Sequence, residues 1–122
     1  FIVVDIHGEI TSEKMAMGYL FDGKATLVVG THTHVPTSDH RIMEKGTAYQ
    51  TDVGMCGDYR SVIGMNRDNS LKKFLKDPSA IKHHPALGEA TISGIMVDAD
   101  DKTGLAIKVE PIILGKNLEN RI

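Results

Sequence analysis

The sequence has little of several residue types, and each shortage narrows what the protein can be. Among its 122 residues there are one cysteine, Cys56, and no tryptophan, and aromatic residues make up 5%. A single cysteine cannot form a disulfide within the chain, so we expect a reducing, cytoplasmic setting. No Walker-type G-x-x-x-x-G-K-[ST] motif is present, so the glycines within residues 53–65 are interpreted as turn residues and not as a phosphate-binding loop.

Long apolar runs and a large excess of one charge are also missing. No stretch reaches the roughly 18 apolar residues that suggest a membrane span, so we expect none. The 14 Lys and Arg residues and 16 Asp and Glu residues give a formal net charge of -2. This near-neutral balance argues against dedicated nucleic-acid binding. A small nucleotide substrate stays open, because an enzyme can meet phosphate with metal ions in place of Lys and Arg.

The size and composition are those of one soluble globular domain or of part of one. Apolar residues make up 41% of the sequence and charged residues 25%, which are ordinary values. The sequence opens at Phe1 inside a strand-like run, without a methionine or a leading turn. We therefore expect the chain to be part of a longer protein.

The first elements alternate between strand and helix, which indicates an α/β fold. Residues 1–6, FIVVDI, are apolar and β-branched without alternation, as in a buried strand. Thr11 or Ser12 can cap a helix over residues 12–22. The run ATLVV at 25–29 predicts the next buried strand. A strand, a helix and a strand in this order predict two parallel strands joined by a crossover.

The remainder of the chain predicts two hairpins around an irregular region. Two alternating apolar and polar stretches flank the turn sequence DDKTG, which is typical of an antiparallel hairpin. In chain order, we expect a hairpin over residues 40–52, an irregular loop over 53–65, a short helix over 67–75, an antiparallel hairpin of 90–100 with 105–114, and a frayed polar tail from 115.

Histidines follow the ends of both predicted parallel strands. His7 follows the first strand in DIHGE, and His32 and His34 follow the second in VVGTHTHV. The carboxyl ends of parallel strands meet at one edge of the sheet, so we expect the three side chains on one rim. Where the second strand bends into a loop, its two rings can diverge toward two adjacent metals. Imidazole nitrogen is a common ligand for zinc, iron and manganese, so the sequence predicts a metal site here.

Three imidazoles alone leave a pair of dications short of negative charge. A two-metal hydrolase normally uses a bridging carboxylate or hydroxide to hold two dications about 3.5 Å apart. Asp5, Glu9, Asp39 and Asp52 are the candidate carboxylates, and none stands out by its spacing. Asp5 is equally suited to orient a histidine ring from behind and to cap a turn.

The other reactive side chains are interpreted as surface or structural residues. A lone histidine in a loop is usually a surface residue, so we expect His83 and His84 in an exposed loop. A surface position is also favoured for His40 over one that lines the site. Cys56 has no base at a telling spacing, so a catalytic thiol is not expected. An H-x-H pattern after a strand is itself a weak motif, and a surface loop remains its alternative interpretation.

Three sequence blocks together resemble one known family. They are D-x-H-x-E-x-T-S-E-K from residue 5, G-T-H-T-H-V from residue 30 and T-D-V-G-M from residue 51. With these blocks, residues 1 to about 114 resemble the C-terminal half of the bacterial YmdB-like proteins. Those proteins are calcineurin-like metallophosphoesterases active on 2',3'-cyclic nucleotides.

The resemblance implies a two-metal site in an α/β/β/α sandwich. It implies two divalent or mixed-valence metal ions, with iron or manganese favoured and zinc or magnesium as alternatives. By position, His7 and His32 match histidines that bind one metal, and His34 matches the histidine that binds the other. The remaining ligands of such proteins are an Asp, a bridging Glu followed by Asn, and an Asn-His pair whose histidine is the proton donor. They precede this sequence, so residues 1–122 are expected to be the C-terminal portion of a single metallophosphoesterase domain.

Two hypotheses for function follow. In the first, the chain is part of a two-metal phosphodiesterase for small cyclic nucleotides or related phosphodiesters, and is inactive without its N-terminal segment. In the second, it is a non-catalytic metal-binding or oligomerising module, because an isolated half-sandwich exposes apolar strand edges and associates. The expected partners are the small substrate and either a second copy of the chain or the missing segment, without a membrane or a dedicated nucleic-acid partner.

Overall fold

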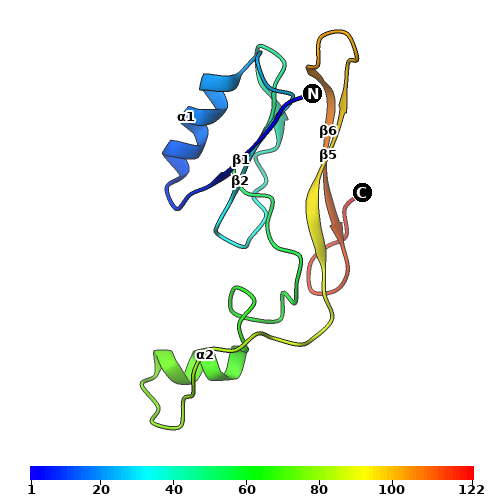
Figure 1. Cartoon of the computed structure of the whole chain (residues 1–122). Coiled ribbons are helices and arrows are strands. Elements are labelled where there is room, and N and C mark those ends of the chain that lie inside the picture. Colours follow the sequence, from blue (N-terminus) through cyan, green and yellow to red (C-terminus); the bar gives the residue numbers. More distant parts are fainter.

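Two sheets, two helices and their connecting loops make up the structure, a computed structural model that describes residues 1–122 (Figure 1). The helices have the bounds α1 Thr11–Phe21 and α2 Arg67–Phe74. In chain order, the strands are β1 Val3–His7, β2 Leu27–Thr31, β3 Arg41–Ile42, β4 Ala48–Gln50, β5 Ile92–Ala99 and β6 Ala106–Leu114.

The first sheet has four strands in the order β1-β2-β4-β3. β1 and β4 run parallel to β2, and β3 runs antiparallel to β4. The predicted crossover from β1 through α1 to β2 is therefore confirmed, as is the hairpin over residues 40–52. The register pairs His7 with Thr31, so the ends of β1 and β2 lie level with each other.

The second sheet is the predicted antiparallel hairpin of β5 and β6, and it packs against one face of the first sheet. Leu27 and Val29 of β2 contact this hairpin, whereas Val28 packs on the opposite face with Tyr49 and the helix residue Met15. β2 is thus covered on both faces, which explains why its sequence is apolar without alternation.

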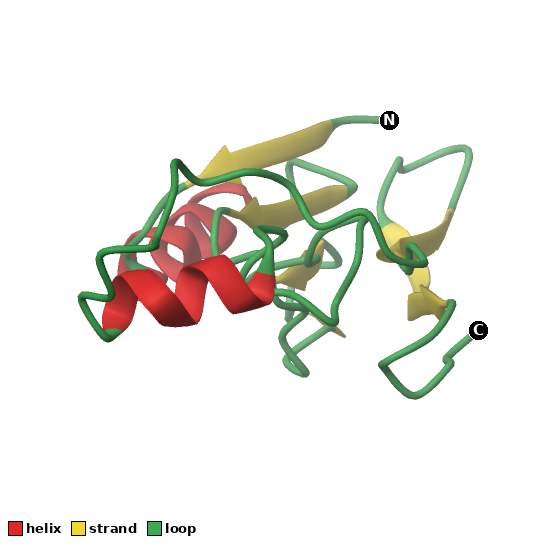
Figure 2. Cartoon of the chain, turned by 90° about the horizontal axis from the view of Figure 1, so that it is seen from below, coloured by secondary structure: helices red, strands yellow, loops and turns green.

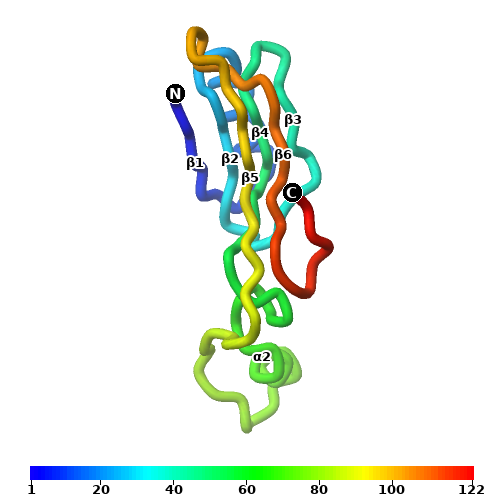
Figure 3. The backbone as a smooth tube through the Cα atoms, turned by 90° about the vertical axis from the view of Figure 1, so that its right-hand side faces the viewer, coloured from blue at the N-terminus to red at the C-terminus, as the bar shows by residue number.

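The layers follow the order helix, sheet, sheet. Seen from below in Figure 2, both helices lie on the side of the first sheet that faces away from the hairpin. Figure 3 shows α2 beyond the end of the two sheets. The chain is therefore a mixed α/β structure with a parallel-strand sheet, and no helix covers the outer face of the β5–β6 hairpin. The expected α/β/β/α sandwich is matched only in its first three layers.

Helix α1 packs closely on the sheet, but it begins differently from the expectation. A Cβ atom on Gly18 would lie 2.7 Å from the Tyr49 ring, so a glycine is needed at this contact. Ile10 stands at the N-cap and provides no side-chain hydrogen bond, so the predicted cap at Thr11 or Ser12 is wrong. The first turn is exposed, so water can satisfy its free N–H groups.

Strand β1 forms as predicted, but the prediction that it is buried is wrong. Phe1, Ile2 and Val3 are 77%, 56% and 64% exposed. β1 is the outer strand of the sheet, so its free edge has no neighbour. On the face toward the second sheet, an apolar groove of about 350 Å³ runs between Phe1 and Val3 on one side and Ile95 and Val97 on the other.

The remaining predictions for the second half of the chain agree with the structure except at the tail. The loop over 53–65 is irregular, and α2 and the β5–β6 hairpin form as expected. The tail is not frayed, because the backbone of Arg121 pairs with Ile113 in both directions at 2.7 and 2.8 Å. Gly115, at φ 146°, allows this reversal. Neither helix has the length and apolar character needed to cross a membrane.

Candidate metal centre

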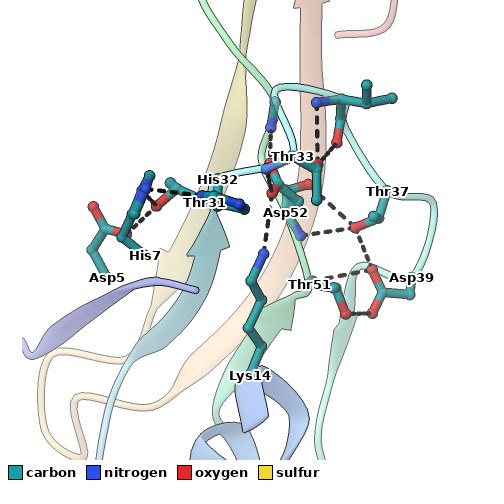
Figure 4. A network of polar contacts seen from close by, with 12 residues as sticks. Asp5, His7, Lys14, Thr31, His32, Thr33, Thr37, Asp39, Thr51 and Asp52 are labelled. Atoms are coloured by element: carbon teal, nitrogen blue, oxygen red, sulfur yellow. Dashed lines mark hydrogen bonds and ion pairs between the residues drawn. The ribbon is translucent and has the colours of Figure 1, made fainter. Parts of the chain in front are cut away.

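His7 and His32 meet at the carboxyl ends of β1 and β2. His7 is the last residue of β1 and pairs with Thr31, the last residue of β2. His32 directly follows Thr31. Figure 4 shows the two side chains turned toward each other, with Nδ1 of His32 3.2 Å from Nε2 of His7. The rings are edge to face, with centroids 5.0 Å apart. The parallel register therefore places two residues that are 25 positions apart in the sequence at neighbouring strand ends.

The distance between these nitrogens suits two ligands of one metal ion. Imidazole binds zinc at about 2.0–2.1 Å, so two such nitrogens subtending 90–109° lie roughly 2.8–3.4 Å apart. The observed 3.2 Å falls within that interval. Without a metal, the same atoms form a hydrogen bond, and the nitrogen that donates it would give up its proton to bind a cation.

A short relay orients the His7 ring. The Thr31 hydroxyl donates to Asp5 Oδ1 at 3.2 Å, and His7 Nδ1 lies 3.1 Å from the same hydroxyl oxygen. Because the Thr31 proton is directed at the carboxylate, the hydroxyl accepts from His7 Nδ1–H. Nε2 of His7 then keeps its lone pair toward His32, which is the arrangement a metal-binding histidine needs. Of the two roles left open for Asp5, the contacts favour the orienting one, which acts through Thr31 and without a direct bond to His7.

His34 lies apart from this pair and has its own anchor. Its Nδ1 is 2.7 Å from the backbone carbonyl of Ile63, in the loop over 53–65. A carbonyl can only accept, so Nδ1 carries the proton and Nε2 is the nitrogen left for a ligand. The chain contains no group of three or more His, Cys, Asp or Glu side chains able to hold a metal ion. The structure thus brings together two of the three predicted histidines and holds the third on a separate contact.

The backbone of the histidine loop is unusual at both histidines. His32 has φ 111° and His34 has φ 66°, in a region that non-glycine residues rarely adopt. Each such residue costs about 1–3 kcal/mol and persists only where its surroundings hold it. The predicted bend at the end of β2 is therefore present. Strained residues of this kind gather at functional sites, which is consistent with a binding role for the loop.

A buried ion pair lies beneath the histidine loop. Asp52 is one of the candidate carboxylates named from the sequence, but the sequence does not predict its pairing with Lys14. Lys14 of α1 is 1% exposed and Asp52 is fully buried, with Nζ and Oδ2 3.2 Å apart. Asp52 also accepts the backbone N–H groups of Thr33 and Gly54, each at 2.9 Å. Burial acts to raise the pKa of Asp52, but these hydrogen bonds and Lys14 outweigh it and hold the pKa below its usual value.

The candidate carboxylates do not bridge the histidines in this structure. Asp52 is committed to Lys14 and two backbone amides. Asp39 accepts the hydroxyl groups of Thr37 and Thr51 at 2.6 and 2.5 Å. Burial acts to raise the pKa of Asp39, but these bonds outweigh it, so the pKa lies below its usual value. Glu9 is exposed, and Asp5 is the only one of the four that reaches the pair, through Thr31.

The other reactive residues lie outside the histidine pair. His83 is exposed, as predicted, whereas His84 is half-buried. The surface position favoured for His40 is wrong. It is half-buried, lines a cavity of about 230 Å³, and its buried Nδ1 has no partner. Cys56 is exposed, and its Sγ lies 3.5 Å from the carbonyl of Ser93 with no base bonded to it.

Comparisons with known proteins agree on one family. The chain is 49% identical over 114 residues to the 2',3'-cyclic-nucleotide 2'-phosphodiesterase of Bacillus subtilis, covering 93% of this chain and 43% of that protein. It is 44% identical over 111 residues to a Mycoplasma genitalium protein described as a phosphatase/phosphodiesterase, covering 90% of this chain and 39% of that protein.

Solved structures share the fold. A crystal structure of a hypothetical protein from Thermus thermophilus superposes with a TM-score of 0.84 at 39% identity, covering 94% of this chain and 44% of that one. A phosphatase from Mycoplasma pneumoniae superposes with a TM-score of 0.83 at 44% identity, covering 92% of this chain and 40% of that one.

The chain spans less than half the length of these relatives, and in the B. subtilis enzyme it matches the C-terminal part. The relatives whose activity is named are phosphodiesterases or phosphatases, and thus hydrolases. Residues 1–112 match the family described as YmdB-like protein, and with the identities above this match shows that the chain belongs to that family.

Proposed function

We propose that the chain is the C-terminal portion of a metal-dependent phosphodiesterase that hydrolyses 2',3'-cyclic nucleotides. The observation that carries the proposal is the 3.2 Å approach of His7 Nε2 to His32 Nδ1 at one sheet edge. The named activity of the B. subtilis relative supplies the reaction and the substrate class. That activity belongs to a protein more than twice as long as this chain, so its transfer to this chain is part of the proposal.

Two metal ions are assigned to the three histidines in this proposal. His7 and His32 hold one ion, and the free Nε2 of His34 binds the second. Iron or manganese is proposed, and imidazole nitrogen suits either. When bound, the two ions would supply Lewis-acid stabilisation of the phosphoryl charge and activate a water nucleophile.

The residues of this chain orient the ligands and leave the proton transfer to another segment. Asp5 and Thr31 set the tautomer of His7, and the Ile63 carbonyl sets that of His34. No further His, Cys, Asp or Glu side chain of this chain forms a metal-binding group with the histidine pair. We therefore place the proton donor and the carboxylates that complete the two metal sites in the N-terminal part of the protein.

The exposed edge of the sheet is the proposed contact for that N-terminal part. β1 has a free edge, and its first residues are apolar and exposed. The groove beside them, of about 350 Å³, is lined mainly by apolar residues. An unpaired strand edge with an apolar face associates readily, and added chain length on this side would cover both. For the whole protein we also propose a reducing, cytoplasmic setting, on the basis of the single cysteine.

An activity comparison tests the proposal. The 122-residue chain and the longer protein that contains it would each be assayed with 2',3'-cyclic AMP and added Mn²⁺. We expect clear turnover by the longer protein and little by the chain alone, because two of its histidines supply only part of one coordination sphere. His7→Ala in the longer protein is the negative control and should abolish most of the turnover. Turnover by the 122 residues alone would contradict the placement of the missing ligands.

A second function, a non-catalytic metal-binding or oligomerising module, is kept because only two ligands meet in this chain. It predicts that the longer protein binds metal and self-associates but hydrolyses no phosphodiester. Bis-p-nitrophenyl phosphate, which demands no nucleotide recognition, separates the two functions. Hydrolysis of this substrate favours the enzyme, and its absence in a metal-loaded protein favours the module.

A further inference from the structure

A buried pair of opposite charges lies directly behind the histidine loop. The side chains of Lys14 and Asp52 are 1% and 0% exposed, and Nζ and Oδ2 are 3.2 Å apart. Removing two charges from water is costly unless additional hydrogen bonds satisfy them. The other partners of the two side chains therefore indicate what the pair holds in place.

The carboxylate of Asp52 joins three separate parts of the chain. Its Oδ2 accepts from Lys14 on α1 and from the backbone N–H of Thr33, and its Oδ1 accepts from the N–H of Gly54. The backbone of Asp52 adds three bonds to Thr37, at the far end of the same loop, at 2.9, 2.9 and 3.2 Å. Figure 4 shows this network on the inner side of the loop, next to His32. The loop is thus anchored at its middle and at its end by one residue.

Thr33 lies between His32 and His34, and both of these histidines have left-handed backbone. His32 and His34 have φ of 111° and 66°. This backbone conformation is unfavourable for non-glycine residues, so contacts with other parts of the chain must stabilise it. The N–H of Thr33 is donated to a carboxylate at 2.9 Å, and a bond to an ionised acceptor is stronger than one between neutral groups. Loss of this acceptor would release both neighbouring residues.

We propose that Lys14 and Asp52 are positioning residues for the metal-binding loop. Asp52 fixes the N–H of Thr33, and through it His32 and His34, and Lys14 fixes the carboxylate of Asp52. This inference rests on the proposed function, because it takes His32 to be a metal ligand. Neither side chain touches the space between the His7 and His32 nitrogens, so neither is a catalytic residue.

Two double variants separate positioning from simple support of the fold. K14M/D52L removes both charges and keeps the site filled, a replacement that buried ion pairs often tolerate. It leaves the N–H of Thr33 without an acceptor. K14M/D52N also removes both charges, but its amide oxygen can still accept from Thr33. The presence of that acceptor is therefore the difference that bears on the loop.

Cobalt binding provides a readout that does not depend on activity. The longer protein that contains this chain and its variants would be titrated with Co²⁺ and followed by visible absorption, with H7A/H32A as the baseline. We expect the Kd of K14M/D52N to lie within about threefold of that of the unsubstituted protein. K14M/D52L should bind about 10–100-fold more weakly, the usual effect of losing an outer partner of a metal ligand. Lys108→Ala, in an exposed pair on β6, is the matched control and should change nothing.

Histidine-ring ¹H–¹⁵N spectra of the metal-free chain provide the second readout. The Nδ1–H tautomer of His34 should persist in K14M/D52N and average with the other tautomer in K14M/D52L. If K14M/D52L does not fold, K14M/D52S replaces it, because a serine hydroxyl is too short to reach Thr33. Equal Co²⁺ affinity in the folded Leu or Ser variant and in the Asn variant would overturn the inference and leave the proposed metal site standing. Failure of the unsubstituted longer protein to exceed the H7A/H32A baseline would overturn both.

Discussion

At the scale of single residues, the site depends on side chains that hold other side chains in place. His7 is directed by Thr31, which is itself directed by Asp5, and His34 is directed by a backbone carbonyl. Thr31 carries no metal-binding chemistry, so inspection of the sequence for ligands assigns it no role. Its importance comes from the register of β1 and β2, which places its hydroxyl between Asp5 and His7.

The assignment of His34 leads to a prediction about metal content. In the longer protein, His34→Ala should remove about one equivalent of metal, because Nε2 of His34 is the nitrogen assigned to the second ion. Elemental analysis of the purified protein measures this directly. His83→Ala is the control, since that ring is exposed and outside the site. An unchanged metal content in the His34 variant would count against the two-metal assignment.

The hydrogen bonds of Asp39 lead to a prediction about acid stability. Its folded pKa lies below the usual 3.8, so the stability it contributes is present above that value and is lost as the pH falls through the folded pKa. Asp39→Asn should lower the free energy of unfolding near neutral pH by about 1–2 kcal/mol, the usual effect of weakening hydrogen bonds to a charged group. It should also shrink the difference in stability between pH 6 and pH 3.

Urea denaturation at the two pH values tests this prediction. Glu9→Gln serves as the control, because Glu9 is exposed and makes no hydrogen bond or ion pair. If the Asp39 variant loses as much stability between pH 6 and pH 3 as the unsubstituted chain, the hydrogen bonds of Asp39 have no part in the acid response.

At the scale of elements, most of the arrangement follows from local pattern and the rest from contacts between elements. The apolar run of β2, the hairpin around DDKTG and the crossover through α1 all match the structure. The predicted burial of β1 does not match the structure. An apolar run indicates that a strand is suited to burial, but it does not show which segment covers the strand. In the same way, Lys14 and Gly18 of α1 are buried while Leu20 is 56% exposed, since the sheet and Asp52 decide which face of the helix packs inward.

The close approach of β2 to the segment after β4 leads to a prediction for Gly30. A Cβ atom at this position would lie 1.8 Å from the Thr51 carbonyl oxygen, which belongs to the backbone and cannot turn aside. Gly30→Ala should therefore lower the free energy of unfolding by about 3 kcal/mol or more, at the upper end of the cost of overpacking. Gly94→Ala is the matched control, because a Cβ there meets nothing within 4 Å. Equal urea midpoints for the two variants would show that the contact is not as tight as described.

At the scale of the whole molecule, the first sheet is packed on both faces, whereas the candidate metal site has only two of the ligands it needs. The first sheet is packed on one face by α1 and on the other by the β5–β6 hairpin. The candidate metal centre, in contrast, contains two histidines that meet and no third His, Cys, Asp or Glu side chain beside them. The chain also spans only 43% of the B. subtilis relative. An incomplete ligand set and an exposed apolar strand on the same piece are both expected when one domain is split into two segments.

The sequence by itself determined the elements, the parallel pair of strands and the histidines at their ends, because these depend on local periodicity and on where apolar runs stop. It also contained the family blocks that identified the chain. Only the tertiary structure decided that His7 and His32 meet while His34 contacts Ile63, that Asp52 accepts hydrogen bonds from Lys14 and Thr33, and that β1 is open on one side. The physical reason is that a side chain's partner is set by strand register, loop backbone and packing between distant segments, none of which a local pattern contains.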